Sequence, residues 1–229
     1  MVSYAHQQLR DAILSNAIPA DTTLSQVQLA KQLGLSRTPL REALRLLEHE
    51  GLATVEVNKK VTVANVSPED LDALYALRIQ QESLAIFAAV RAFDPENVDR
   101  AREHLTGMED AVNGQDYEQW AQHHRVFHMS LVAGVNDRFT RSIQQHFDHA
   151  DRYRRIYLSE SQTNWGRSMV EHRSILDAVL SRKPAEAAEL LARHYSHTAR
   201  GVLTAIDGDY TPDLMNAAVT MALSLRFQQ

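Results

Sequence analysis

Cysteine is absent from this chain of 229 residues, and glycine and proline are scarce, with 8 and 6 residues. Without cysteine the protein has no disulfide bonds and no thiolate metal ligands, which fits the cytoplasmic location that we expect. No apolar run is long enough to cross a bilayer, and we expect neither a signal peptide nor a membrane partner. The 44% hydrophobic and 23% charged residues are typical of a globular protein.

Positive charge is also in short supply, because the net charge is −5, and this value alone argues against DNA binding. The charges are unevenly distributed, however. Residues 1–66 hold 7 Lys and Arg against 6 Asp and Glu, whereas residues 67–229 hold 17 against 23. We therefore predict an N-terminal domain over residues 1–66 and an acidic C-terminal domain over residues 67–229, which we do not expect to touch DNA.

The segment 36–51 predicts a helix with two different faces. Its apolar residues, spaced as one helical stripe, are Leu40, Ala43, Leu44 and Leu47. Its cationic residues, spaced four apart on another face, are Arg37, Arg41 and Arg45. A helix that packs one face on a core and presents guanidinium groups on the other is suited to a polyanion. Arginine also fits guanine edges and phosphates better than other side chains do.

The neighbouring segments place this helix in a known supersecondary order. Helices are predicted over 3–16 and 25–34, and Gly34 ends the second of them. The alternation of apolar residues over 53–63 predicts a two-stranded hairpin with a basic tip. Three helices followed by a hairpin form a winged helix-turn-helix, in which the third helix enters the major groove. The residues that we predict to contact DNA are Ser36, Arg37, Thr38, Arg41, Arg45, Lys59 and Lys60.

The C-terminal domain is predicted to be helical throughout. The helices expected from hydrophobic periodicity span 68–92, 95–112, 115–134, 137–160, 165–182, 184–206 and 211–226. The fold class is therefore mainly α, with a winged helix-turn-helix followed by a bundle of six to seven helices. The segment 211–229 could pack on this bundle or on a partner subunit.

Histidine is unusually frequent, with 11 residues in the chain and most of them in the helical domain. Those predicted to point inward from apolar helix faces are His124, His128, His172 and His194. Each could be a core histidine that is satisfied by a neighbour. Alternatively, one divalent metal could satisfy all of them, because imidazole is a good ligand for Zn, Ni, Cu or Fe. The other histidines of this domain, of which His123 is the nearest competitor to His124, are expected at the surface or around the site.

Two arginines are candidates for binding an anion. Arg78 is predicted to face inward on the first helix of the bundle, where it could pair with Glu82 or line a cavity that accepts a carboxylate. Arg152 belongs to a dense cluster with Arg154 and Arg155, and could form a second clamp or lie in solvent.

These features together resemble the GntR family of bacterial transcription regulators, and within it the FadR-like branch with an all-helical FCD effector domain. The segments that carry the resemblance are Leu29–Ala30, the run 34–44, Glu50–Leu52, Leu77–Arg78 with Glu82, Phe127–His128 with Asn136, Glu171–His172 and His194. The resemblance covers nearly the whole chain and thins after Gly208. Two positions depart from the family pattern at the DNA-binding end: segment 25–28 lacks a basic residue, and the wing turn at 58–60 lacks glycine.

The resemblance implies a homodimer that binds a palindromic operator in double-stranded DNA and usually represses transcription. It also implies a metal in the effector domain with a small organic acid beside it, and it adds Asn136 to Arg78 and Arg152 as expected effector contacts. In the family the metal is usually held by one Asp and three His. The three histidines correspond to His128, His172 and His194, while His124 stands where the family has Asp. This exchange favours a nitrogen-preferring ion, with Zn first and Ni or Cu as alternatives.

Two other interpretations stay open from the sequence. In the first, the protein is a metal-sensing repressor, and the metal itself is the signal. In the second, it is a metalloenzyme fused to a DNA-binding domain. The segment 124–128 has no Glu in the place of the general base of an HExxH motif, so we do not expect an enzyme.

Overall fold

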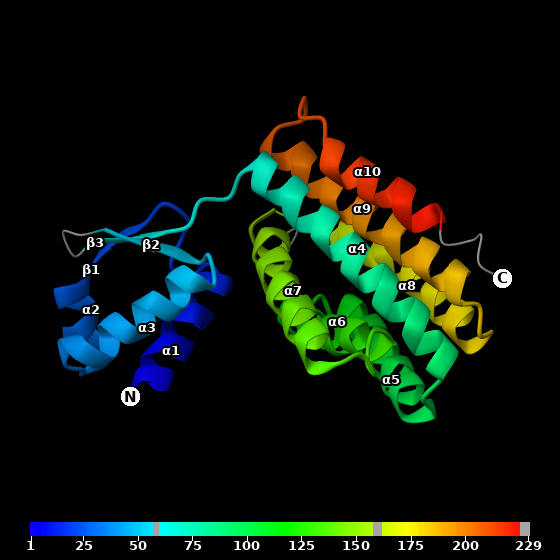
Figure 1. The fold of residues 1–229 in the computed structure, drawn as a ribbon, viewed down its shortest axis with the longest axis horizontal. Coiled ribbons are helices and arrows are strands. Elements are labelled where there is room, and N and C mark those ends of the chain that lie inside the picture. The colour runs from blue at the N-terminus through cyan, green and yellow to red at the C-terminus, as the bar shows by residue number, and fades with distance from the viewer. Residues whose placement is uncertain (57–59, 158–161, 225–229) are drawn as a thin grey trace. The chain divides into compact units, whose positions relative to one another are not determined.

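The structure, a computed structural model, describes residues 1–56, 60–157 and 162–224. The chain divides into two compact units, Met1–Ser67 and Pro68–Gln229 (Figure 1). The predicted fold class is confirmed: a winged helix-turn-helix precedes an all-helical unit. Among the helices of the described residues, none combines the length and apolar character that a membrane span requires.

The N-terminal unit has three helices and a small sheet. Its elements are α1 (Val2–Leu14), β1 (Thr23–Ser25), α2 (Gln26–Leu33), α3 (Arg37–His49), β2 (Ala53–Val55) and β3 (Lys60–Val63). Gly34 ends α2 in the left-handed conformation, with φ of 65°, as the sequence predicts. The chain can therefore turn sharply into α3 and complete the helix-turn-helix.

The sheet has one strand more than the predicted hairpin. Its order is β1-β3-β2, and both pairings are antiparallel, with Leu24 and Val55 each opposite Val61. Thr23–Ser25 was not predicted as a strand because three residues are too few to display a period of two. Of the predicted basic tip, Lys59 lies outside the described residues, whereas Lys60 begins β3 and is exposed.

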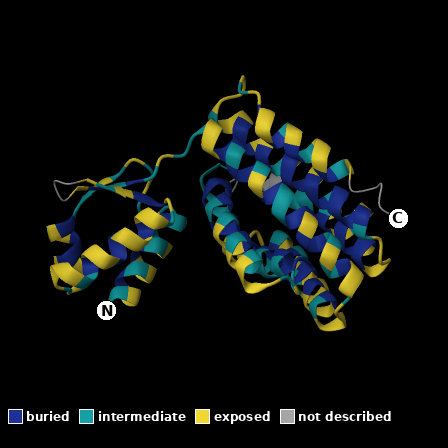
Figure 2. Cartoon of the chain, in the orientation of Figure 1, coloured by how far each residue is buried: buried dark blue, intermediate teal, exposed yellow. Residues whose placement is uncertain are grey.

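The apolar stripe of α3 forms the centre of the N-terminal core. Leu40, Ala43, Leu44 and Leu47 are each at most 1% exposed. The three leucines pack in a cluster that also contains Leu9, Ile13, Leu29, Leu52, Val61 and Val63. Because this face of α3 is committed to the core, the opposite face with the arginines is left at the surface (Figure 2).

The C-terminal unit contains seven helices in its described residues. They are α4 (Pro68–Ala92), α5 (Pro95–Gly114), α6 (Tyr117–Leu131), α7 (Asp137–Tyr157), α8 (Gln162–Leu180), α9 (Pro184–Ile206) and α10 (Asp213–Leu223). The predicted boundaries agree to within a few residues, because caps such as Asp94 and Asp116 mark the starts of α5 and α6 in the sequence. Small buried residues on α9, including Ala188 and Ala192, allow this helix to lie close along α4 (Figure 1).

The last described helix, α10, packs on α4 and α9 of the same chain. Its start is held by a buried carboxylate from α4. Asp72 Oδ1 accepts a hydrogen bond from the backbone N–H of Met215 at 2.8 Å, and Oδ2 accepts one from the N–H of Leu214 at 3.2 Å. Asp72 thus supplies from another helix the acceptor that the start of α10 needs. Of the two alternatives for segment 211–229, packing on the bundle is what the described residues show.

Removal of the Asp72 carboxylate should release α10. We expect Asp72→Ala to lower the free energy of unfolding by about 1–3 kcal/mol, because two backbone donors lose their acceptor. It should also speed hydrogen exchange of the amides in α10. The matched control is Asp213→Ala, an exposed acidic residue in the first turn of α10, which should cost only a few tenths of a kcal/mol. Urea unfolding curves that are equal for the two variants would contradict the capping role.

Candidate DNA-binding face and candidate metal centre

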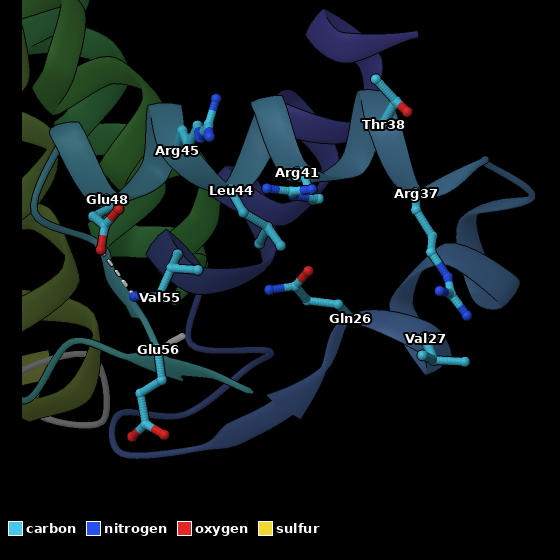
Figure 3. A pocket seen from close by; sticks show the side chains of 10 residues that line it. All are labelled: Gln26, Val27, Arg37, Thr38, Arg41, Leu44, Arg45, Glu48, Val55 and Glu56. Atoms are coloured by element: carbon cyan, nitrogen blue, oxygen red, sulfur yellow. Dashed lines mark hydrogen bonds between the residues drawn. The ribbon is translucent and has the colours of Figure 1, made fainter. Parts of the chain in front are cut away.

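The exposed face of α3 borders a groove with a volume of about 540 Å³ (Figure 3). Arg37, Thr38 and Arg41 line it from α3, Gln26 lines it from α2, and Glu56 follows β2 on the wing side. The groove is thus lined by α2, by α3 and by the end of β2, and its cationic groups are the guanidinium groups of α3. Such a groove can accept the edge of a polyanion.

The arginines of α3 differ in their partners. Arg45 donates a hydrogen bond from Nη1 to Glu42 at 2.9 Å. Within the part of the chain that the structure describes, Arg37 and Arg41 have no ion pair or hydrogen-bond partner, so their donors are available. Ser36 and Thr38 are exposed at the start of α3, and the Ser36 side chain makes no cap hydrogen bond. The available donors thus concentrate at the N-terminal end of α3, where base contacts are usual for this motif.

Sequence reasoning assigned no role to two residues of this groove. Gln26 is only 8% exposed and extends its amide into the space between α3 and β2 (Figure 3). Glu48 Oε1 accepts a hydrogen bond from the backbone N–H of Val55 at 3.0 Å, so α3 and the wing are held together. For Gln26 the sequence held one indication, because segment 25–28 lacks the basic residue of the family pattern. Nothing in the sequence indicates the contact of Glu48 with Val55.

The four histidines predicted to point inward converge at one place in the helical unit. Each of His124 and His128 from α6, His172 from α8 and His194 from α9 offers a nitrogen, and these nitrogens lie within 4.8 Å of one another. All four side chains are buried, with exposed fractions of 0–3%. His128 Nε2 and His172 Nε2 are only 3.2 Å apart. Tetrahedral nitrogens bonded to one Zn²⁺ would be about 3.3 Å apart, so small side-chain movements would suffice to hold an ion.

The second nitrogens of two of these imidazoles have partners that set their tautomers. Glu171 Oε2 lies 2.7 Å from His194 Nδ1, and a carboxylate accepts the proton there. The Tyr195 hydroxyl donates to Glu82 and lies 3.1 Å from His128 Nδ1, so its oxygen accepts the His128 proton. In both rings Nε2 is therefore the unprotonated nitrogen, and that of His128 faces His172 Nε2. This arrangement of outer partners is typical of histidines that bind a metal.

The other two rings show polar atoms that need a partner. Nδ1 of His124 and Nδ1 of His172 are buried and have none among the described residues. Leaving such atoms unpaired away from water costs free energy. A cation recovers that cost only at the nitrogen that binds it, which can be Nδ1 in His124, whereas His172 directs Nε2 toward His128. Trp120 stacks on His124 with ring centroids 4.4 Å apart and thereby fixes the orientation of that ring. The donor set of imidazole nitrogens fits a divalent transition metal.

Burial also keeps the imidazoles in the form that binds metals. Desolvation, followed by the charge of neighbouring histidines and of Arg154, lowers the pKa of His124, His128 and His172 well below 6.5. Desolvation lowers the pKa of His194 as well, although Glu171 opposes this shift. All four rings are therefore neutral at pH 7, as metal coordination requires.

Arg78 forms the ion pair with Glu82, which is the first of the two alternatives that the sequence left open. Its Nε donates to Glu82 Oε1 at 2.8 Å, and both side chains have an exposed fraction of 0%. The guanidinium lies over the ring of Tyr195, 4.1 Å from its centroid, while Nη1 is buried without a partner among the described residues. Burial opposes the charge, but Glu82 and Tyr195 raise the pKa of Arg78 above its ordinary value. Arg78 is thus a permanent buried cation whose Nη1 group is available as a hydrogen-bond donor.

The structure separates Arg152 from its neighbour in the cluster. Arg152 and Arg154 are each 4% exposed on α7, but it is the charge of Arg154 that lowers the pKa of all four histidines. Arg154 also lies over the ring of Phe147, 4.9 Å from the centroid. Arg154 is therefore a second buried cation close enough to affect the histidines, and the effector contact of Arg152 stays a prediction. Side chains two positions apart on a helix point in directions about 200° apart. Which of Arg152 and Arg154 faces the histidines therefore depends on the exact rotation of α7 about its axis.

Asn136, expected from the resemblance to contact an effector, has a different place. It is exposed at the start of α7, and its Oδ1 accepts a hydrogen bond from the backbone N–H of Phe139 at 3.1 Å. This is the position of a helix N-cap, for which asparagine is among the best residues. The structure thus gives Asn136 a capping role, and its contact with an effector stays a prediction.

Two family descriptions match the sequence. The model for bacterial regulatory proteins of the gntR family matches residues 3–63, and the model for the FCD domain matches residues 73–197. The first range contains α3 and the groove, and the second contains all four histidines and Arg78.

Individual relatives cover most of the chain. It is 30% identical over 199 residues to the HTH-type transcriptional repressor GlaR of Escherichia coli, covering 82% of this chain and 90% of GlaR. It is 26% identical over 193 residues to the HTH-type transcriptional regulator YdhC of Bacillus subtilis, covering 84% and 86%. Among solved structures, E. coli McbR/YncC superposes with a TM-score of 0.74 at 23% identity, covering 86% of this chain and 93% of that one, which shows a similar fold.

Loss of the Tyr195 hydroxyl should weaken the candidate metal centre. We expect Tyr195→Phe to reduce the affinity for Zn²⁺ by about 10–100-fold, because His128 loses the partner that fixes its tautomer. Competition with a chromophoric chelator measures this affinity. The matched control is Tyr153→Phe, which removes another buried hydroxyl, one that donates to Asp70 at 2.7 Å. Equal zinc affinities in the wild type and both variants would refute the role of Tyr195.

Proposed function

Because this chain belongs to the GntR family of bacterial regulators and carries an FCD domain, we infer that it is a homodimeric, ligand-responsive repressor of a palindromic operator. Like these relatives, it is a DNA-binding transcription regulator and not an enzyme. The observation that carries the DNA-binding proposal is the pair of guanidinium groups of Arg37 and Arg41 at the groove of α3, which have no partner within the described part of the chain. Repression and a cytoplasmic site of action are parts of the proposal, and the name of GlaR as a repressor supports the former.

The DNA contacts follow from where the donors lie. Arg37 and Arg41 are proposed to contact base edges in the major groove, and Thr38 a base or a phosphate. Arg45 and Lys60 are exposed and are proposed to contact phosphates. One such unit offers a single short α3, so two copies on a palindrome supply the affinity that one lacks.

In the helical unit we propose a divalent transition metal held by His124, His128, His172 and His194. The ligand set contains nitrogen alone, which favours Zn, Ni or Cu over ions that prefer oxygen, such as Mg or Mn. When bound, the metal would act as a Lewis acid that attracts a carboxylate oxygen. The residues of the chain fix the rest: Glu171 and Tyr195 orient the rings, and Trp120 supports His124.

The effector is proposed to be a small carboxylate that is recognised by Arg78 and Arg154. Nη1 of Arg78 is a buried donor without a partner among the described residues, and a carboxylate oxygen would satisfy it. Arg78 and Glu82 lie on α4, and Tyr195 on α9 links them to His128 on α6. A ligand at Arg78 would therefore bias the packing of three helices, provided that it binds one packing more tightly than the other.

The second candidate function is a metal-sensing repressor. It is favoured by the complete burial of the four imidazoles, because an enclosed site of nitrogen ligands can respond to the metal alone. In that case the packing of α6, α8 and α9 would depend on the ion without any organic ligand. The two functions make different predictions for operator binding.

Substitution of Arg41 should reduce both affinity and specificity for the operator. We expect Arg41→Ala to cost about 1–3 kcal/mol and to relax the preference at one base position. The control is Lys60→Ala, which should lower the salt dependence of binding while leaving the preferred sequence unchanged. Binding titrations against operator variants at several salt concentrations measure both effects. An Arg41→Ala protein with wild-type affinity and selectivity would refute the assignment.

A comparison of metal-free and metal-loaded protein decides between the two candidate functions. With a carboxylate effector, we expect operator affinity of the zinc-loaded protein to change on addition of an organic acid. Arg78→Lys should abolish this response while keeping zinc stoichiometry, because lysine retains the charge but not the planar pair of donors. If operator affinity follows free zinc alone and no organic acid changes it, the metal itself is the signal.

A further inference from the structure

A second group of histidines lies outside the buried cluster. His104 on α5 and His123 on α6 face each other, with 2.9 Å between their Nδ1 atoms and 5.0 Å between ring centroids. Both side chains are partly exposed, unlike the four buried ones. From this pair we propose a second metal site, in which His104 and His123 chelate one Cu(II) or Ni(II) ion at the surface of the helical unit.

The distance between the two nitrogens selects the geometry of the ion. With metal–nitrogen bonds of about 2.0–2.1 Å, nitrogens separated by 2.9 Å subtend an angle of about 90° at the metal. This is the angle between neighbouring ligands in square-planar and octahedral complexes. The pair therefore suits Cu(II) or Ni(II), with water in the remaining positions.

The chain holds one of the rings in place by leaving out a side chain. Gly107 lies within α5, and a Cβ atom built there would be 2.3 Å from Cε1 and 2.4 Å from Nδ1 of His123. Glycine inside a helix costs about 1 kcal/mol relative to alanine. The His123 ring thus rests directly on the backbone of α5, which fixes its Nδ1 toward His104. A preorganised pair loses less conformational freedom when it binds an ion.

An ion bound at the pair would link two helices of the unit. It joins α5 to α6, and α6 also carries His124 and His128 of the buried cluster. An ion at the pair would fix α6 from its outer side. The proposal stands independently of the buried centre, because it uses different nitrogen atoms on partly exposed side chains.

Copper titration of the full chain without an affinity tag tests the proposal. We expect chelator-treated wild type to bind one Cu(II) more per chain than His104→Gln, as measured by elemental analysis after gel filtration and by the nitrogen hyperfine structure in electron paramagnetic resonance. His49→Gln, which removes an exposed histidine of the other unit, is the control and should keep the full stoichiometry.

A second variant keeps the test decisive if His104→Gln folds poorly. Gly107→Ala retains both histidines but places a methyl group where the His123 ring lies, so its affinity for the extra Cu(II) should fall at least tenfold. Equal copper stoichiometry and affinity in the wild type, His104→Gln and Gly107→Ala would overturn the site. Loss of copper in His49→Gln to the same extent would overturn it as well, because binding would then be nonspecific.

Discussion

The helical unit depends on one constraint: polar groups taken out of water must be satisfied by one another or by an ion. Four imidazoles, the guanidinium groups of Arg78 and Arg154, and the carboxylate of Glu82 are among the polar groups buried between five helices. A continuous series of hydrogen bonds from Arg78 through Glu82 and Tyr195 to His128 satisfies part of these groups. Among the described residues, the buried atoms without a partner include Nδ1 of His124, Nδ1 of His172 and Nη1 of Arg78, and the groups that carry them are those to which we assign ligands.

The same constraint explains why a ligand could change the packing of the unit. A buried network is stable when each member has its partner, and it becomes costly when one is removed. Because α4, α6 and α9 contribute to one network, a partner gained or lost on any of them alters the favoured arrangement of all three. The N-terminal unit needs no such network, since its core is apolar and its charges are at the surface.

Much of the fold and of the candidate sites could be predicted from residue spacing. The two faces of α3 and the inward direction of His124, His128, His172 and His194 follow from helical periodicity, which depends on neighbours in the sequence. Contacts between distant segments carry no such signal. The pairing of β1 with β3, the cap that Asp72 provides for α10 and the contact of Tyr195 with His128 each join residues that are far apart in the chain.

The choice between Arg152 and Arg154 shows a further limit, because a small rotation of one helix decides which side chain faces the histidines. Asn136 shows the opposite limit: a residue shared with a family can have a local structural role, here as the cap of α7.

The stacking of Trp120 on His124 has a practical consequence. Trp120 is one of only two tryptophans in the chain, and its indole lies against a ring of the candidate centre. Intrinsic fluorescence is sensitive to such contact, and paramagnetic ions such as Cu(II) and Ni(II) quench a nearby indole strongly whereas Zn²⁺ does not. The protein therefore contains its own fluorescent probe. Without any added label, the intensity of its emission would distinguish Cu(II) or Ni(II) from Zn²⁺ in the bundle.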